Sequence, residues 1–226
     1  FDILGAQTTG YSLKPKNEFD LINCFNELCN HNSVIGDIRD LEKLNSSIKE
    51  FKPDFIFHLA AQPIVRYSYK NPIETYETNV MGTLNLLESV KNLSNPCSLI
   101  MITTDKVYKN TESIYPHRED DKLGGYDPYS SSKACSELLI ASYRDSFFNI
   151  ENYNLHKKAI AVARAGNIIG GGDWSEDRLI PDLASSLYNK QKLIIRSPNS
   201  VRPWQHVIDA LIGYLILGEK LSLNPN

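Results

Sequence analysis

Short apolar runs recur along this chain, and segments with a helical pattern separate them. The runs Phe55–Ala61, Ser98–Thr103 and Ala159–Ala163 are mostly aliphatic and aromatic. Continuous apolar runs of this length are typical of parallel strands buried on both faces. Between two such runs, a long helix is predicted from Pro72 to about Lys91. Alternating strands and helices predict an α/β domain with a parallel sheet and helices on both faces.

Weaker patterns complete the predicted order of elements. Residues 7–11 and 33–35 predict short strands. Helices are predicted at 19–29, 41–51 and 129–149, where the second has apolar residues at the three-and-four spacing of an amphipathic helix. The elements become shorter after Gly170, with a turn at 170–174, a helix at 179–188, a strand at 193–195 and a helix at 207–219. We therefore predict a larger domain at 1–165 and a small lobe at 166–226.

Polar residues follow the predicted strands at their carboxyl ends, where parallel sheets bind ligands. They are Asp37, Gln62, Thr104 to Lys106, and Asn167. Between the last two groups lies Tyr129-x-x-x-Lys133, on a helix that Pro128 is expected to start because its fixed φ suits the first turn. One polar residue at a strand end means little, but four such positions beside a Tyr/Lys helix predict a pocket.

Tyr129 and Lys133 are four residues apart, so a helix places them on one face. A phenol titrates near 10 in water, and a neighbouring ammonium group favours the phenolate. Lys133 is therefore expected to lower the pKa of Tyr129, which would make Tyr129 a base for an alcohol proton. By itself a Tyr-x-x-x-Lys pattern is more often a solvated helix face, and the neighbouring strand-end residues decide against that interpretation.

Composition excludes several other classes of protein. The 226 residues carry 24 basic and 27 acidic side chains, a net charge of −3, which gives no basis for binding nucleic acid or an anionic membrane. No apolar run is long enough to span a bilayer. The four cysteines lack the paired spacing of a zinc site, and we expect reduced thiols in a cytoplasmic protein without a bound metal.

Six motifs stand in a fixed order along the chain: Asp37-Ile38, Leu59–Gln62, Thr78-Asn79, Thr103–Lys106, Tyr129/Lys133 and Arg202–Val207. In this order they resemble the extended short-chain dehydrogenases/reductases that act on nucleotide sugars. Gly124–Tyr129, Arg164–Trp174 and Arg202–Val207 are most similar to the 4,6-dehydratases of that family. The resemblance covers essentially the whole chain. It implies a Rossmann-like, doubly wound sheet with NAD as cofactor and a substrate lobe at 166–226.

The resemblance also implies a reaction. Tyr129 would take the proton of the sugar C4 hydroxyl while hydride leaves C4 for NAD, Lys133 would hold the nicotinamide ribose, and Thr104 would bind the C4 oxygen. Protonated Asp105 would help the C6 hydroxyl leave, and Lys106 stands where the C5 base is expected. Hydride then returns to C6, which yields a 4-keto-6-deoxy sugar with no net use of cofactor.

Lys106 bears on the nucleotide. Family members that act on dTDP-glucose carry Thr-Asp-Glu here, whereas this chain has Thr-Asp-Lys, as do members that act on CDP-glucose. The resemblance therefore implies CDP-glucose as the substrate. The microscopic role of Lys106 stays open, and an ordinary ion pair between Asp105 and Lys106 is the plainer alternative.

The resemblance assigns further residues to binding. Those expected at the cofactor are Asp37, Ile38, Leu59, Ala60, Ala61, Gln62, Thr78, Thr103, Tyr129 and Lys133. Those expected at the substrate are Arg66, Thr104, Asn167, Arg178 and Arg202. Arginine suits the diphosphate because its planar fork matches phosphate oxygens. Asp37 could equally be the N-cap of the next helix, Arg178 a surface residue, and His206 a packing residue.

The family's first strand and glycine-rich turn are expected before residue 1, and residues 1–226 contain neither. In the strand order 3-2-1-4-5-6 the first strand is central, so residues 7–11 and 55–61 would lack a common neighbour. We therefore expect an internal fragment of a longer enzyme, one that binds NAD poorly or not at all. Tight NAD binding in isothermal titration calorimetry would contradict this expectation. The resemblance also implies a homodimer or homotetramer through the helices at 72–92 and 129–149.

Three alternatives remain at this point: an epimerase of the same fold, a dehydratase for another nucleotide sugar, and a catalytically silent binding protein. An epimerase has no use for the acid and base after Thr104, so Asp105 and Lys106 argue against it. A silent fold has no chemical need for Thr104, Asp105, Tyr129 and Lys133 together.

Overall fold

A parallel three-stranded sheet forms the centre of the molecule in the computed structural model, which describes residues 5–15, 20–25 and 31–225. Its strands are β3 (Phe55–His58), β4 (Cys97–Thr104) and β5 (Lys158–Ala165), in the order β3-β4-β5. Phe55 pairs with Ser98, and Cys97 pairs with Lys158. The predicted α/β fold with parallel strands is confirmed, and the three carboxyl ends lie at one edge of the sheet.

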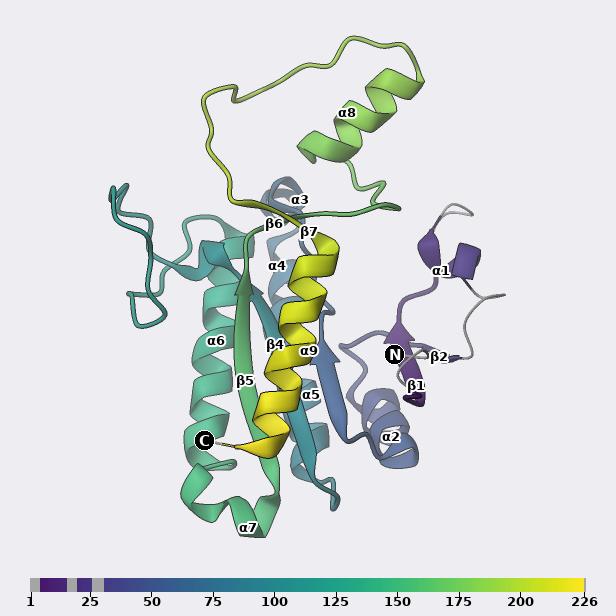
Figure 1. The fold of residues 1–226 in the computed structure, drawn as a ribbon, viewed down its shortest axis with the longest axis vertical. Coiled ribbons are helices and arrows are strands. Elements are labelled where there is room, and N and C mark those ends of the chain that lie inside the picture. Colours follow the sequence, from purple (N-terminus) through teal and green to yellow (C-terminus); the bar gives the residue numbers. More distant parts are fainter. Residues whose placement is uncertain (1–4, 16–19, 26–30, 226) are drawn as a thin grey trace.

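Two further strands, β1 (Thr8–Ser12) and β2 (His31–Ile35), form a separate parallel pair. Within the described part of the chain no ladder of hydrogen bonds joins this pair to β3. Figure 1 shows the two groups of strands standing apart. The separation agrees with the expectation that residues 7–11 and 55–61 lack a common neighbour.

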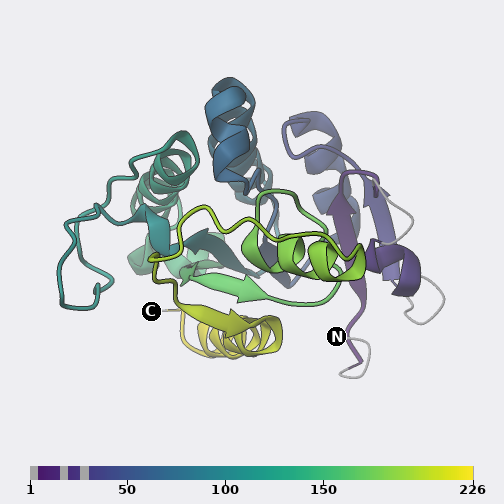
Figure 2. The same cartoon turned by 90° about the horizontal axis from the view of Figure 1, so that it is seen from above.

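Helices cover both faces of the sheet (Figure 2). On one face lie α2 (Leu41–Phe51), α5 (Gly82–Lys91) and α6 (Pro128–Ser146), and on the other lies α9 (Val207–Leu223). Two short helices are α1 (Leu21–Phe25) and α7 (Tyr153–His156). Two 3-10 turns lie at Asp105–Val107 and Ile150–Asn152.

The helix α2 begins and ends where its sequence predicts. The Asp40 side chain accepts a hydrogen bond of 3.0 Å from the backbone N–H of Lys43, which satisfies a free donor of the first turn. Leu44 and Ile48 are buried one turn apart. Asp40, not Asp37, is therefore the N-cap, so the alternative role considered for Asp37 is wrong.

The long helix predicted from Pro72 is interrupted. It consists of α4 (Pro72–Tyr76), a π turn at Glu77–Met81, and α5. A π turn inserts one residue into the helix and is frequent at functional sites. A further helix before it, α3 (Val65–Lys70), was not predicted.

The lobe after Asn167 contains β6 (Asn167–Ile169), α8 (Leu179–Tyr188) and β7 (Trp204–His206), and β6 pairs with β7 in parallel. The helix α8 has the predicted bounds. The predicted strand at 193–195 is wrong: Ile194 and Ile195 are exposed and no strand lies beside them to pair with. The helix predicted at 207–219 continues to Leu223 as α9.

Two other predictions need comment. The helix expected at 129–149 ends at Ser146. Of the helix expected at 19–29, residues 21–25 are helical, while residue 19 and residues 26–29 lie outside the described residues. Cys97 and Cys135 are free thiols; Cys29 and the side chain of Cys24 lie outside what the structure describes.

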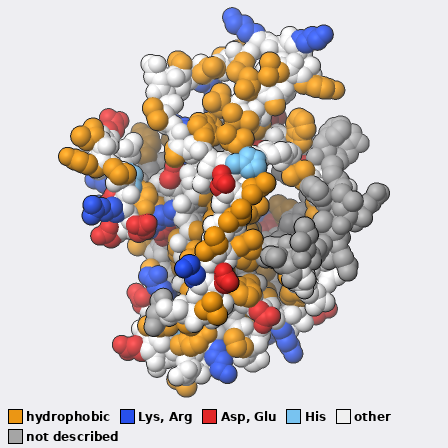
Figure 3. Space-filling view, viewed as in Figure 1, with side chains coloured by type: hydrophobic (Ala, Val, Ile, Leu, Met, Phe, Trp, Pro, Cys, Tyr) orange, Lys and Arg blue, Asp and Glu red, His pale blue; other side chains and the backbone are white. Residues whose placement is uncertain are grey.

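Each face of the sheet has its own core. The larger core joins α2, α5, α6 and the sheet, with Leu87, Val90 and Leu99 fully buried. A smaller core lies under α9, around Ile100 and Tyr214. The outer face of α9 is also apolar, and Figure 3 shows its hydrophobic side chains in a stripe along the helix. Among the described helices, none has the length and apolar character of a membrane span.

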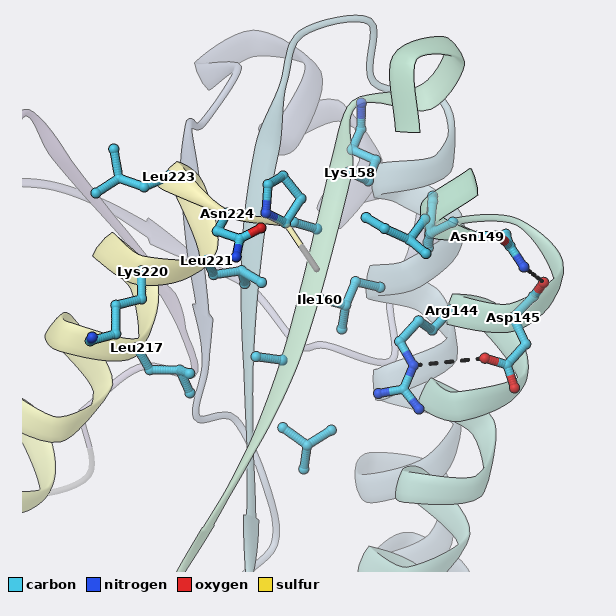
Figure 4. Close-up of a pocket in the computed structure, with 16 residues that line it drawn as sticks. Arg144, Asp145, Asn149, Lys158, Ile160, Leu217, Lys220, Leu221, Leu223 and Asn224 are labelled. Atoms are coloured by element: carbon cyan, nitrogen blue, oxygen red, sulfur yellow. Dashed lines mark hydrogen bonds and ion pairs between the residues drawn. The ribbon is translucent and has the colours of Figure 1, made fainter. Parts of the chain in front are cut away.

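A groove lies far from the carboxyl ends of the strands. It has a volume of about 750 Å³ and runs beside β5, between the last turns of α6 and α9. Figure 4 shows Ile160 on its floor, with Leu217 and Leu221 on one side and Arg144 on the other. Among the described strands β5 pairs with β4 alone, so this groove runs along an open sheet edge. It contains none of the predicted site residues.

Candidate active site

Most of the predicted catalytic residues lie together where β4 and β5 end and α6 begins. In Figure 1 this is the upper edge of the sheet, next to β6 and below α8. The residues that the fold gathers there are Thr104, Asp105, Lys106, Tyr129, Lys133 and Asn167. These residues come from two strand ends, one 3-10 turn and the first turns of one helix.

The first turn of α6 fixes the position of Tyr129. The Asp127 carboxylate caps the helix: it accepts from the backbone N–H of Ser130 at 2.9 Å and from the Ser130 hydroxyl at 2.6 Å. Pro128 is the first helical residue, as predicted. The backbone N–H of Tyr129, a donor with no partner inside the helix, donates to the buried Ser68 hydroxyl at 3.1 Å. A buried residue of the helix α3 therefore helps to hold the Tyr129 backbone.

The pKa of Tyr129 is raised, and the expectation that Lys133 lowers it is wrong for this structure. Burial is the main cause, since removing a phenolate from water is costly. A hydrogen bond with Thr104 and the charge of Arg178 act in the opposite direction, and the Asp105 carboxylate raises the pKa further. These effects place Thr104, Arg178 and Asp105 around the phenol.

Lys133 instead points at the sheet. Its ammonium group is buried and donates to the backbone carbonyl of Ile102 at 3.0 Å. Burial lowers the pKa of Lys133 to about 8, while the neighbouring Glu137 carboxylate raises it. Near neutral pH the lysine is thus close to its titration range, which suits a group that shares a proton with a base.

Asp105 is held between two donors. The Thr104 hydroxyl donates to its carboxylate at 3.1 Å, and the Lys106 ammonium lies 3.3 Å from the same oxygen. Lys106 also donates to the side-chain oxygen of Asn167 at 3.4 Å. All of these side chains are buried or half-buried. The ion pair expected as the plainer alternative for Asp105 and Lys106 is present, and 33% of each side chain is exposed.

A buried amide that the sequence did not single out connects the site's segments. Asn79, in the π turn, accepts from the backbone N–H of Gln62 at 2.8 Å and donates to the Gln62 carbonyl at 3.1 Å. It also donates to the Ser132 hydroxyl at 2.8 Å. The backbone carbonyl of Asn79 accepts hydrogen bonds from the hydroxyls of Thr83 and Ser136. The pair Thr78-Asn79 belongs to a recognised motif, which was the available signal, but the role was given to Thr78 alone.

His58 lies beneath this network. Its Nε2 is 3.0 Å from the hydroxyl of Thr83, which itself donates to the Asn79 carbonyl, so Nε2 carries the proton. Burial, together with the smaller effect of the Lys133 charge, lowers the pKa of His58 to about 3. His58 is therefore a neutral donor and a structural part of the site's floor.

The predicted cofactor residues line the ends of β2 and β3. Leu59 is exposed and Ala60, Ala61 and Gln62 are half-buried, so this segment is accessible from solvent. Ile38 packs so closely on Gly82 that a Cβ there would lie 2.5 Å from an Ile38 methyl. This open, small-residue shelf fits the flat, extended shape of a dinucleotide.

Two other predicted cofactor residues are engaged elsewhere. Asp37 accepts from the Arg39 guanidinium at 2.6 to 3.1 Å, and those hydrogen bonds lower the pKa of Asp37. Thr103 donates to the Glu137 carboxylate at 2.6 Å and is buried. Asp37 still follows the end of β2, and Thr103 still lies at the end of β4.

The predicted substrate arginines do not converge on one point. Arg66 pairs with Asp177 at 2.7 Å, and Arg178 pairs with Asp173 at 2.8 Å. Arg202 is exposed and donates to the carbonyl of Val201. Sequence reasoning missed Asp177 and its second partner, Arg196, because nothing in their local sequence distinguishes them from surface charges.

His206, expected to pack in the interior, is exposed. Its ring nitrogen accepts from the backbone N–H of Ile208 at 3.3 Å and caps α9. Among the described residues no group of three or more His, Cys, Asp or Glu side chains could hold a metal ion.

The parallel sheet, with a buried Tyr/Lys helix and an Asp/Lys pair at its carboxyl edge, defines an α/β protein of the nucleotide-sugar epimerase and dehydratase type. The chain belongs to the GDP-mannose 4,6 dehydratase family, whose model matches residues 17–218. It is 52% identical over 221 residues to CDP-glucose 4,6-dehydratase of Salmonella typhimurium, a match that covers 96% of this chain. The chain spans 61% of that protein's length.

Solved structures show the same fold. The dTDP-glucose 4,6-dehydratase of Bacillus anthracis, in complex with NAD, matches with a TM-score of 0.77 and 27% identity over 95% of this chain and 63% of its own. A UDP-glucose 4-epimerase from Thermotoga maritima matches with a TM-score of 0.82 over 96% of this chain and 67% of its own, at 20% identity. The second match supports the fold alone.

Proposed function

We propose that the whole protein is a hydro-lyase, a CDP-glucose 4,6-dehydratase that uses NAD and yields CDP-4-keto-6-deoxyglucose. One observation carries the proposal: a buried phenol, a hydroxyl, a carboxyl and an amine, from Tyr129, Thr104, Asp105 and Lys106, converge at one end of β4. An oxidation alone needs the first two groups, and an elimination needs the others. The 52% identity to the Salmonella enzyme supports CDP-glucose as the substrate.

Each group has a role that its surroundings support. Tyr129 would take the C4 hydroxyl proton, helped by its hydrogen bond with Thr104 and the charge of Arg178, which both favour the phenolate. The Lys106 ammonium, 3.3 Å from the Asp105 carboxylate, would first give that carboxylate a proton. Asp105 would pass the proton to the C6 hydroxyl as it leaves, and the neutral Lys106 amine would take the C5 proton. Lys133, with a pKa of about 8, would pass protons to and from Tyr129.

NAD, when bound, would supply the acceptor and donor of hydride. The shelf of residues 59–62 would lie under its pyrophosphate and ribose, and Ile38 would lie beside the adenine. Asp37, whose carboxylate is bonded to Arg39, and Thr78 would also contact the cofactor on the adenine side. Lys133 and Tyr129 would hold the nicotinamide ribose. Thr103 would contact NAD through its backbone, because its hydroxyl donates to Glu137.

The lobe would hold the nucleotide. Asn167, already bonded to Lys106, lies closest to the catalytic groups, and Arg178 lies near the phenol. Arg66 and Arg202 are exposed, and each would exchange its present partner, Asp177 or the Val201 carbonyl, for a diphosphate. In this proposal residues 1–165 form a Rossmann-like dinucleotide domain, and residues 166–226 form the substrate lobe.

We also propose a cytoplasmic homodimer or homotetramer that uses the helices at 72–92 and 129–149. Support comes from apolar side chains left exposed on these helices. Ile73 is 75% exposed and Leu138 is 61% exposed, on α4 and α6, which pack side by side. Sedimentation of a double Ile73→Glu, Leu138→Glu variant should show a smaller species than the wild type.

The test of the activity uses the whole protein with NAD and CDP-glucose. Formation of a 4-keto sugar, followed by its alkaline ultraviolet absorbance, supports the proposal. Tyr129→Phe should lose activity by at least about a hundredfold, the lower range for a general base. Tyr126→Phe is the matched control: this exposed tyrosine precedes the helix by two residues, and the variant should retain activity. Inversion at C4 without loss of water would identify an epimerase instead.

The same assay addresses the nucleotide. Faster conversion of dTDP-glucose or UDP-glucose than of CDP-glucose would contradict the proposed substrate while leaving the dehydratase reaction intact. The absence of any product from all three would contradict both.

A further inference from the structure

Glu137 is a buried carboxylate that the proposed reaction does not use. It lies on α6 one turn after Lys133 and two turns after Tyr129, so the three residues form one stripe of the helix. Only 5% of Glu137 is exposed. A buried charge is costly unless it is paired and hydrogen-bonded. Glu137 should therefore have close donors, and among the described residues the side chains of Thr103 and Arg164 provide them.

Arg164, on β5, is the principal partner. Its Nε lies 2.8 and 3.0 Å from the two oxygens of Glu137, and its Nη2 donates to the same carboxylate. The Thr103 hydroxyl at the end of β4 donates to Glu137 at 2.6 Å. One carboxylate thus connects the helix that carries Lys133 to the ends of two strands.

The same guanidinium also holds a surface segment, residues 108–124, which we call the flap. Arg164 Nη1 donates to the Tyr108 hydroxyl at 2.8 Å and to the Glu119 carbonyl at 2.7 Å. The guanidinium lies 4.7 Å from the centre of the Tyr108 ring, which stacks on His117. The flap leads directly into the Asp127 cap of α6. Arg164 therefore holds both the body of α6 and the segment that enters it.

The contact extends to Lys133. Thr103 follows Ile102, whose carbonyl accepts from the Lys133 ammonium at 3.0 Å, so Glu137 and Lys133 bind adjacent residues of β4. Glu137 raises the pKa of Lys133 against the larger effect of burial. The other titratable groups near Lys133 in the described structure are Tyr129 on its own helix and neutral His58 from β3. The positive charge of Arg164 faces Glu137 from β5.

We propose that Glu137 and Arg164 are positioning residues of the candidate active site. The pair fixes the height of Lys133 and Tyr129 above the ends of β4 and β5, and it supplies the negative charge that the buried Lys133 ammonium requires. The inference deepens the proposed function and rests on it for its effect on turnover. Its effect on Lys133 itself does not depend on any substrate.

Glu137→Gln tests the charge because glutamine keeps the size and the acceptor for Thr103. The measurement is the labelling rate of Lys133 by a small amine reagent across a pH series, read by mass spectrometry. The wild type should show a midpoint near its pKa of about 8. In Glu137→Gln the midpoint should move to lower pH by about one unit, since a nearby opposite charge shifts a pKa by roughly this much or more.

Asp145→Asn is the matched control. It makes the same chemical change on the same helix, at an exposed carboxylate whose partner is the neighbouring Arg144. It should leave the Lys133 midpoint unchanged. An unchanged midpoint in folded Glu137→Gln would overturn the proposed electrostatic role, because a merely structural carboxylate would not move it.

Arg164→Lys is the second variant. It keeps the positive charge but loses the planar guanidinium that binds Glu137 and the flap at the same time. Hydrogen exchange in the flap should become severalfold faster, with little change in α2. Equal exchange in variant and wild type would contradict the role of Arg164. This arm remains informative if Glu137→Gln fails to fold.

The kinetic arm uses the whole protein with NAD and CDP-glucose. Glu137→Gln should lower kcat about tenfold or more and shift its pH profile toward acid, while KM changes less than about threefold. An equal loss in kcat/KM at all pH values would point to a structural role alone. If the wild type shows no dehydratase activity but the Lys133 midpoint still moves, the proposed function fails and the positioning role stands.

Discussion

The two sides of the candidate site are built differently. On the sheet side, Glu137 and Arg164 form an ion pair that is mostly buried, with 5% and 18% of their side chains exposed. On the lobe side, Asp177 joins Arg66 and Arg196 in a bridge that is largely exposed. No side chain of α8, which begins two residues after Asp177, is buried.

This difference separates two tasks. A buried, fully bonded pair holds one geometry because breaking it leaves a charge without water or partner. Exposed ion pairs contribute little and rearrange readily, since water replaces the partner. We infer that the sheet side fixes the reacting groups and that the lobe side adapts to the nucleotide. Asp177 supports this view, because its φ of 63° is an uncommon backbone conformation for a residue with a side chain.

The largest expected effect comes from breaking the buried pair. Arg164→Met should destabilise the protein by about 3–5 kcal/mol, since Glu137 would stay buried without its cation. Arg66→Met, the same change on the lobe side, should leave the urea midpoint nearly unchanged. Similar shifts of the urea midpoint in the two variants would remove the distinction between the two sides.

An acid-dependent loss of stability should come next in size. His58 has a pKa of about 3 when folded and about 6.5 when unfolded, so below pH 6.5 the unfolded chain takes up a proton that the folded protein does not. This residue should therefore reduce stability by up to about 1.4 kcal/mol for each pH unit between 6.5 and 3.

His58→Gln isolates that contribution. Glutamine can still donate to Thr83 but does not titrate, so the variant should lose less stability than the wild type between pH 6.5 and 4.5 in urea titrations. His117→Gln is the control on the exposed flap, where the ring is partly in water. Parallel acid profiles for wild type and His58→Gln would show that His58 is not held neutral.

The smallest effect is expected at the bridge of the lobe. Asp177→Asn should leave global stability almost unaltered, yet amide exchange in residues 171–200 should become severalfold faster because the bridge to Arg66 and Arg196 is lost. Exchange in β4 and α6 should stay the same. A slowdown, or a change confined to the sheet, would contradict the adaptable role of the lobe.

Local patterns predicted much of the fold. The bounds of α2 and α8 agree with the sequence because apolar spacing and capping groups act within one helix, as Asp40 does for α2. The strand at 193–195 failed because a strand also needs a neighbour. The π turn was missed for a related reason: it depends on hydroxyls from Thr83 and Ser136 that bond to the Asn79 carbonyl.

Local patterns also located part of the candidate site. Strand ends and the Tyr/Lys spacing correctly located Thr104, Asp105, Tyr129 and Lys133. The direction of the Tyr129 pKa was wrong, because burial depends on the packing of distant segments and Lys133 turns to the Ile102 carbonyl. Glu137 and Arg164 are 27 residues apart, and no local pattern pairs them.

The most direct test asks whether oxidation and elimination share one place. The whole protein carrying Asp105→Asn should be mixed with NAD and CDP-glucose, and NADH absorbance and sugar products should be followed in one turnover. The account predicts that NADH forms and persists, because Tyr129 and Thr104 still act while the C6 hydroxyl lacks its acid. Normal release of the 4-keto-6-deoxy product, with no NADH accumulating, would contradict the assignment of Asp105 and the shared site with it.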